Sequence, residues 1–354
     1  MPHSPLSIRE NAPLAELTTL GVGGPARWLV AVDSELACRR AYAFARERAA
    51  PTWLLAGGSN CIIADAGLPG VVLRPSLRQG ETGITEEGPG RLRVAGGTRW
   101  DDLVAWTVAR GWQGLEALSG IPGQVGAAPI QNIGAYGQEI AEVVLWAEGY
   151  DVATDEARSW SREDCQFAYR DSWFKRNPQA AVVTAVHLQL RPGGAAAVHY
   201  DQLAEALLKT GVRDNPTLEQ VRNIVLQLRR SKGMVVDPHD SDSRSCGSFF
   251  TNPVVDLATA ERAFELVQRA GEVAPRWFLA DGRVKLSAAW LIERCGWQRG
   301  HTHGPVGLSS KHTLAIINRG GATASEVLAF AEAVSGQVLD RSGVLLQREP
   351  VLLG

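Results

Sequence analysis

A glycine-rich stretch between residues 114 and 140 constrains the fold of this 354-residue chain more than any other feature. It reads GLEALSGIPGQVGAAPIQNIGAYGQEI, and its glycines and prolines recur too often for a long helix. Its apolar isoleucines and valine are not typical of a mobile linker. A loop of this length within a compact domain is usually functional, and small residues let its backbone lie against a flat or pyrophosphate-bearing ligand.

Strand and helix patterns alternate before this loop. Residues 26–32, 52–58 and 70–76 are short apolar runs that predict strands, and apolar residues recur at helical spacing after a capping Ser34. Residues 77–233 carry further strand patterns at 91–97, 142–154 and 181–190, followed by an amphipathic helix at 217–232 with Thr217 as its cap. Beyond a polar segment, the patterns predict helices at 256–271, 286–296 and 323–335 and strands at 314–318 and 343–354.

Composition excludes several classes of protein. The net charge of −2 provides no bulk basic field for nucleic acid or an anionic membrane. The five cysteines are scattered without a CxxC pair, which argues against a zinc ribbon or a disulfide scaffold. No apolar run reaches the roughly 18 residues of a membrane helix, and the first residues do not resemble a signal peptide. These features favour a reducing cytoplasm.

Two glycine motifs precede the long loop. GVGGPA (21–26) matches the dinucleotide fingerprint only formally, because a strand pattern rather than a helix follows it. AGGSN (56–60) follows an apolar strand, so its backbone N–H groups can converge on an anion, with Ser59 and Asn60 as further donors. An ordinary turn at the end of the strand is the alternative for this motif taken alone.

Three further segments carry candidate chemistry. FAYRDSWFK (167–175) places Arg170 among aromatics, which suits a carboxylate clamp as well as a cation–π brace. In CGSFFTNP (246–253), Ser248 is either a proton donor or a turn residue. Glu349 in REPV lies among apolar residues, where a carboxylate is either paired or functional. HTH (301–303) and His312 have no carboxylate at helical spacing, so we expect a polar loop and no metal.

Taken in order, five segments resemble the UDP-N-acetylenolpyruvoylglucosamine reductase family. They are AGGSN, IPGQVGAAPIQNIGAYG, YRDSWFK, GSFFTNP and LQREPVLLG, and the resemblance spans residues 13 to 354. It implies an α+β fold, in which two α/β lobes form an FAD-binding fold of the PCMH or vanillyl-alcohol-oxidase type and a third α/β domain binds substrate. The implied boundaries are 1–77 plus 340–354 for the first lobe, 78–233 for the second, and 234–339 for the substrate domain.

The family's activity is that of UDP-N-acetylmuramate dehydrogenase in peptidoglycan synthesis. NADPH reduces a non-covalently bound FAD, which then reduces the enolpyruvyl group of a UDP-sugar. The resemblance places three catalytic residues: Arg170 on the substrate carboxylate, Ser248 as proton donor, and Glu349, which assists electrostatically or by orienting the carboxylate and its proton. By the same resemblance, the cofactor contacts are Gly57, Gly58, Ser59, Asn60, Pro122, Gly123, Gly126, Ala127, Gln131, Asn132, Gly134 and Ala135.

Substrate contacts follow from the same resemblance: Tyr169, Tyr200, Arg229, Lys232, Asn252 and His312. Tyr200 fits the group of these enzymes that carries an inserted tyrosine loop. In the terminal motif Val351 stands where the family usually has arginine, and a pairing shifted by two residues places Gln347 at the catalytic position. We expect a monomer. Two alternatives stay open: another PCMH-type FAD oxidase or dehydrogenase, and an inactive UDP-sugar sensor on the same scaffold.

Overall fold

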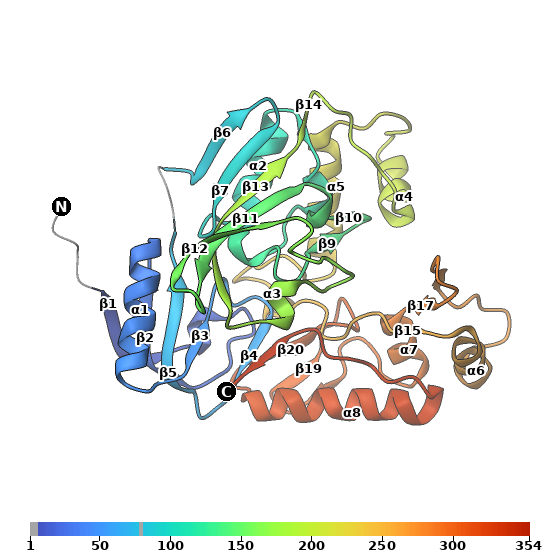
Figure 1. Ribbon diagram of the computed structural model, residues 1–354. Coiled ribbons are helices and arrows are strands. Elements are labelled where there is room, and N and C mark those ends of the chain that lie inside the picture. The colour runs from blue at the N-terminus through green and yellow to red at the C-terminus, as the bar shows by residue number, and fades with distance from the viewer. Residues whose placement is uncertain (1–5, 78–80) are drawn as a thin grey trace. The chain divides into compact units, whose positions relative to one another are not determined.

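The computed structural model of the chain describes residues 6–77 and 81–354 (Figure 1). The chain divides into two compact units. Pro13–Pro25, Gly58–Leu68 and Ser231–Gly354 form the second unit, and the rest, chiefly Ala26–Gly57 and Pro69–Arg230, forms the first. The expected start of the second lobe at residue 78 lies outside the described residues.

A helix covers one sheet of the first unit. The sheet has the order β1-β2-β5-β3, with bounds Ser7–Pro13, Pro25–Val32, Leu68–Pro75 and Thr52–Leu54, and β3 runs parallel to β5. Helix α1 (Glu35–Glu47) begins after Ser34, whose hydroxyl accepts the Ala37 N–H as predicted. Its buried side chains belong to one hydrophobic cluster with those of β2 and β5, and Figure 1 shows the helix beside these strands. Strand β3 ends at Leu54, earlier than the predicted residue 58, because the glycine turn follows.

The second sheet of the first unit is antiparallel. Its order is β12-β11-β13-β7-β6, with bounds Glu156–Ser161, Val144–Asp151, Ala181–Gln189, Arg91–Ala95 and Ile84–Gly88. Helix α2 (Trp100–Ala109) packs Leu103 and Val104 against one face, where Leu92 and Val186 lie. The predicted strands around the glycine-rich stretch therefore all belong to one sheet.

The glycine-rich stretch contains only short elements, as predicted. These are η2 (Glu116–Leu118), η3 (Val125–Ala127), η4 (Ile140–Glu142) and a ribbon of β9 (Gly134–Ala135) with β10 (Gln138–Glu139). A second ribbon pairs β8 (Trp112–Gln113) with β14 (Arg191–Pro192). The unit also contains α3 (Trp173–Arg176), α4 (Asp201–Lys209) and α5 (Leu218–Ser231), and α5 begins after Thr217, whose hydroxyl accepts the Gln220 N–H. Apolar side chains of α4 and α5 form a separate cluster.

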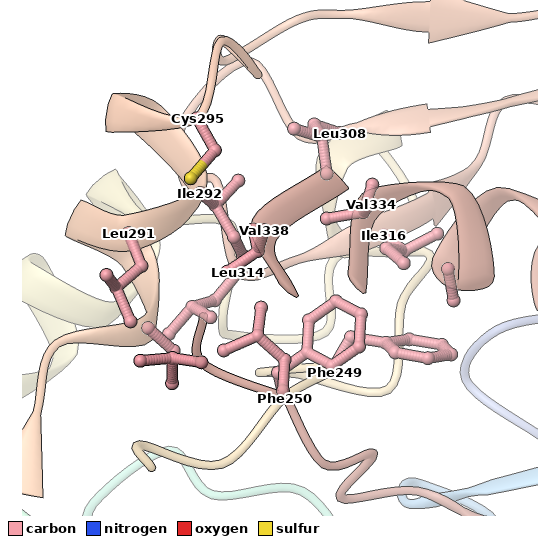
Figure 2. Close-up of a cluster of buried hydrophobic side chains, with 14 of the residues drawn as sticks. Phe249, Phe250, Leu291, Ile292, Cys295, Leu308, Leu314, Ile316, Val334 and Val338 are labelled. Carbon is pink, nitrogen blue, oxygen red and sulfur yellow. The ribbon is translucent and has the colours of Figure 1, made fainter. Parts of the chain in front are cut away.

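Two small sheets and three helices build the second unit. One sheet has the order β15-β17-β16 (Val254–Val255, Val284–Leu286, Arg276–Phe278) and the other β18-β19-β20 (Thr302–His303, Val306–Leu308, Ile316–Asn318). The helices are α6 (Leu257–Val267), α7 (Ala288–Arg294) and α8 (Ala324–Ser342), and single turns are η1 (Ala15–Leu17) and η5 (Ser241–Ser243). Strand β4 (Cys61–Ile63) pairs in parallel with β21 (Val351–Leu353). Figure 2 shows the core, where Phe249 and Phe250 meet side chains of α7, α8 and β20.

Several predicted bounds in this unit are wrong. Helix α6 ends at Val267 instead of residue 271, and strand β20 begins at Ile316 instead of residue 314. Helix α8 continues past residue 335 through Gly336 and ends at Gly343, whose φ of 71° stops it. The C-terminal strand is confined to Val351–Leu353, because Pro350 has no N–H for a ladder.

The five cysteines are free and buried, so the chain has no disulfide scaffold, as predicted. Within residues 6–77 and 81–354, no helix is long and apolar enough to cross a membrane. GVGGPA leads directly into strand β2, which excludes the dinucleotide fingerprint geometry.

Candidate active site

Backbone hydrogen bonds hold the middle of the glycine-rich loop against the second sheet of the first unit. The Gly126 N–H donates to the Gly96 carbonyl at 2.8 Å, and the Val125 N–H donates to the Thr98 carbonyl at 2.9 Å. A Cβ on Gly126 would lie 2.8 Å from the Val183 carbonyl oxygen. No side chain fits at residue 126 unless the backbone moves, so the loop depends on glycine there.

The glycine turn touches this loop backbone to backbone. A Cβ on Gly57 would lie 2.7 Å from the Cα of Gly123, and Gly58 has a φ of +61°. The Gln124 side chain donates to the Pro75 carbonyl at 3.2 Å. Its Oε1 is buried and has no hydrogen-bond partner in the described part of the chain. The turn and the loop therefore meet through backbone atoms at Gly57 and Gly123, next to a buried acceptor, Gln124 Oε1, that no described group uses.

Asn132 is buried, with a left-handed φ of 44°. Its Nδ2 donates to Glu139 Oε2 at 2.7 Å and to the Ala168 carbonyl at 3.0 Å, and its Oδ1 accepts the Ala141 N–H at 3.1 Å. The side-chain amide of Asn132 thus holds the loop together, whereas the neighbouring Gln131 side chain is half-buried.

Arg170 is fixed to the same loop. Its Nη2 donates to the Gly134 carbonyl at 2.6 Å, and its guanidinium carbon lies 5.5 Å from the Tyr169 ring centroid. The backbone of Arg170 is left-handed, with φ 54°, and Lys175 Nζ donates to its carbonyl at 2.7 Å. Arg170 makes both the hydrogen bond to Gly134 and the contact with the Tyr169 ring, so its positively charged guanidinium is held beside the loop.

A second arginine lies close enough to Arg170 for electrostatic interaction. Burial and the positive charge of Arg170 lower the pKa of Arg229, and Tyr136 and Asp101 oppose this shift. The Tyr136 and Tyr200 rings meet edge to face, with centroids 5.7 Å apart. Arg170, Tyr169, Tyr200 and Arg229, four of the predicted residues, thus belong to the first unit. Two nearby guanidinium groups attract anions such as carboxylate or phosphate.

In the second unit, the structure brings Ser248 and Glu349 to one short antiparallel pairing. The Glu349 N–H donates to the Phe249 carbonyl at 2.9 Å, and Phe250 pairs with Arg348. Buried Phe249 and Phe250 anchor this pairing in the core (Figure 2). Ser248 and Glu349 themselves are half-buried.

Asn60 and Ser59 come from the glycine turn and belong to the same unit as this pairing. Asn60 Nδ2 donates to the Glu349 carbonyl at 3.4 Å, and the Asn60 carbonyl accepts the Val351 N–H at 3.0 Å. Asn60 therefore ties the turn to the segment that carries Glu349.

Three predicted substrate contacts, Lys232, Asn252 and His312, also belong to the second unit. The Asn252 side chain accepts the Ala288 N–H at 3.0 Å at the beginning of α7. His312 Nδ1 accepts the Leu314 N–H at 3.0 Å. Burial, with the charges of Lys232 and Arg299, lowers the pKa of His312 to about 4, so the ring is neutral at pH 7 and its Nε2 bears the proton.

A cavity of about 420 Å³ lies within the first unit, at the beginning of α1 and the end of β5. Charged residues of the second sheet line it, among them Arg93, Glu148 and Arg158. None of the predicted site residues lines this cavity. No group of three or more metal-binding side chains occurs among the residues that the structure describes.

Sequence patterns did not identify two residues that hold these groups. Glu139 binds Asn132, and Asp101 binds the N–H of Gly120 at the beginning of the loop. Neither position shows a local motif; the only available signal is an acidic residue beside a glycine-rich segment.

Fold and site together define a flavoprotein. Residues 26–157 match the family model described as an FAD binding domain, and the mixed α/β architecture predicted from the sequence is confirmed. Residues 237–353 match the model for the C-terminal domain of UDP-N-acetylenolpyruvoylglucosamine reductase.

Whole-chain comparisons identify the family. The UDP-N-acetylenolpyruvoylglucosamine reductase of Thermobifida fusca (strain YX) is 44% identical, over 98% of each chain. That of Nocardia farcinica (strain IFM 10152) is 46% identical, over 98% of this chain and 90% of its own. The crystal structure of the reductase from Thermus caldophilus aligns with a TM-score of 0.66 at 25% identity, covering 99% of each chain. The chain belongs to the UDP-N-acetylenolpyruvoylglucosamine reductase family.

Proposed function

We propose that this protein uses NADPH to reduce the enolpyruvyl ether of UDP-N-acetyl-3-O-(1-carboxyvinyl)glucosamine, giving UDP-N-acetylmuramate for peptidoglycan synthesis. The observation that carries the proposal is Arg170, a cation fixed by its bond to Gly134 in the loop that the resemblance assigns to the flavin. The family membership supports the same reaction.

The residues of the glycine loop and turn fit FAD. Neighbouring backbone fills the space that a Cβ would take on Gly57 and Gly126, so the turn and the loop pack closely and present no side chain at these two positions. The unused Oε1 of Gln124 offers an acceptor to a ring N–H. We assign Gly57, Gly58, Ser59 and Asn60 to the pyrophosphate, and Pro122, Gly123, Gly126, Ala127, Gln131, Asn132, Gly134 and Ala135 to the rest of the cofactor. Bound by these residues, FAD would supply the hydride chemistry, from NADPH to the terminal methylene carbon of the enolpyruvyl group.

Arg170 binds the substrate carboxylate in this mechanism. Hydride addition at the methylene carbon moves negative charge onto the carboxylate, so a fixed guanidinium stabilises the transition state more than the ground state. The bonds of Arg170 to Gly134 and of Lys175 to the Arg170 carbonyl keep the guanidinium in one place before substrate arrives.

Ser248 donates the proton to the carbon that bears the ether oxygen, and Glu349 orients the carboxylate and the proton. The pairing of residue 249 with residue 349 supports Glu349 over the shifted alternative. Gln347 is exposed, and its carbonyl accepts the N–H of Thr251, which is farther from Ser248 along the chain than Phe249 is. A serine hydroxyl is a weak acid, so this role requires a cation beside the alkoxide that forms.

The UDP portion is assigned to Tyr169, Tyr200, Arg229, Lys232, Asn252 and His312. Tyr200 is the last residue of the irregular segment 193–200, and its ring packs on Tyr136. Both features support membership of the group with the inserted tyrosine loop. Neutral His312 offers an Nε2–H to a phosphate oxygen. We place the enzyme in the cytoplasm, because five free thiols suit a reducing compartment. We also propose that it is a monomer.

Absorbance spectra of the purified protein test this function. We expect a flavin band that bleaches on anaerobic addition of NADPH and returns when UDP-N-acetylenolpyruvoylglucosamine is added. No flavin after incubation with FAD would refute both the cofactor and the reaction. Bleaching that only air reverses would favour an oxidase of the same fold, and reduction without turnover would favour a sensor.

A further inference from the structure

Asp101 joins three elements of the first unit. It is the second residue of α2, and its Oδ1 accepts the Gly120 N–H at 2.6 Å. Its two carboxylate oxygens accept Nη1 and Nη2 of Arg222 at 2.7 and 2.9 Å, a bidentate pair. The carboxylate thus connects α2 to α5 and to Gly120 in the glycine-rich stretch.

Arg222 and Arg229 lie on the same face of α5, because seven residues make almost two full turns. Burial opposes ionisation of Asp101, but the hydrogen bonds from Arg222 and Gly120 and the charges of Arg222 and Arg229 outweigh it and lower the pKa of Asp101. The negative charge of Asp101 raises the pKa of Arg229, whereas the positive charge of Arg170 lowers it. The pair is partly shielded from solvent, since the side chains of Arg222 and Asp101 are 15% and 32% exposed.

We propose that Asp101 is a positioning residue for substrate binding: its carboxylate fixes α5 through Arg222, so that Arg229 meets the anionic substrate, and it fixes the loop through Gly120. The proposal rests on the proposed function, because it takes Arg229 as a substrate contact. It assigns no chemical step to Asp101, which acts through its partners.

Without the carboxylate, Arg222 has no fixed anionic partner at this point, and the amide N–H groups of an asparagine would face its guanidinium. The α5 face that carries Arg229 then loses its alignment, whereas Arg170 keeps its bonds to Gly134 and Lys175. Binding of the UDP-sugar should weaken, and the chemical step should proceed as before. A general loss of structure would impair both.

The test compares Asp101→Asn with Asp102→Asn in the FAD-loaded enzyme. Asp102 is the matched control: it follows Asp101 in α2, is 61% exposed and has Arg99 Nε at 3.8 Å. For Asp101→Asn we expect KM for the UDP-sugar to rise roughly tenfold, equivalent to about 1.4 kcal/mol, with kcat within about twofold and FAD content unchanged. Arg222→Gln should produce the same rise, and the double variant should add nothing to either single variant.

An unchanged KM in Asp101→Asn overturns the proposal. So does an equal fall of kcat and FAD content, which would show a purely structural role. A measurement without substrate separates this proposal from the proposed function: amide hydrogen exchange of residues 119–126 should accelerate in Asp101→Ala, which removes the acceptor for the Gly120 N–H. If the wild type fails to turn over, the proposed function fails, and unchanged exchange in Asp101→Ala refutes the positioning role separately.

Discussion

Replacing His312 with glutamine should remove a pH-dependent part of the protein's stability. His312 is half-buried, and burial, Lys232 and Arg299 all disfavour its charged form, lowering its pKa from 6.5 to about 4. Its Nδ1 accepts the Leu314 N–H, a hydrogen bond that the doubly protonated ring cannot accept. The folded protein therefore favours the neutral ring.

The sign follows from proton binding. The unfolded chain takes up a proton at His312 near pH 6.5, whereas the folded chain does so only near pH 4. The contribution to stability is therefore fully present above pH 6.5 and is lost as the pH falls from 6.5 to 4. At 1.36 kcal/mol per pH unit the full difference is about 3 kcal/mol, and partial solvent access reduces our expectation to about 1–2 kcal/mol.

Urea denaturation of the FAD-loaded protein at pH 7.5, 6.5, 5.5 and 4.5 measures this effect. The loss of unfolding free energy between the highest and lowest pH should be smaller in His312→Gln than in the wild type by about 1–2 kcal/mol. His303→Gln, a change at an exposed imidazole, is the matched control and should follow the wild type. An equal loss in His312→Gln and the wild type would refute the reasoning.

Three further changes test the site. Ser248→Ala should leave flavin reduction by NADPH near normal and block product formation; equal loss of both half-reactions, followed by stopped-flow absorbance, would remove Ser248 as proton donor. Arg170→Lys should lower turnover more than about tenfold, because an ammonium cannot reproduce bidentate binding of a carboxylate, and steady-state assays with wild-type kcat would contradict this. Gly126→Ala should destabilise the protein by about 1–3 kcal/mol and lower its FAD content, since its Cβ would lie 2.8 Å from the Val183 carbonyl oxygen; an unchanged melting temperature and flavin absorbance would count against a closely packed loop.

Local signals account for the parts of the fold that could be predicted. Helices α1 and α5 begin after Ser34 and Thr217 because each hydroxyl caps the first turn. The predicted helix ended at residue 335, but α8 continues through Gly336, and buried Val334 and Val338 on either side outweigh the cost of about 1 kcal/mol for an internal glycine.

The supporting residues of the candidate site could not be predicted, for a different reason. Asp101 and Arg222 are 121 residues apart in the sequence, and neither lies in a motif. Their pairing depends on how α5 packs beside α2, which no local pattern records. Sequence motifs therefore identified the candidate site residues, but they did not identify the residues that hold them in place.

Arg170 and Asn132 illustrate two roles of motif residues. We propose that Arg170 takes part in the chemistry, whereas Asn132 holds the loop in place. Both have left-handed backbones, which cost a non-glycine residue about 1–2 kcal/mol. Glycine would adopt this backbone more easily at residue 170, but it has no guanidinium, which the proposed binding of a carboxylate requires. Lys175 Nζ binds the Arg170 carbonyl, and the amide of Asn132 makes three internal hydrogen bonds that hold the loop. Polar motif residues such as Lys175 therefore maintain the strained backbone of Arg170, the residue that we propose binds the substrate carboxylate.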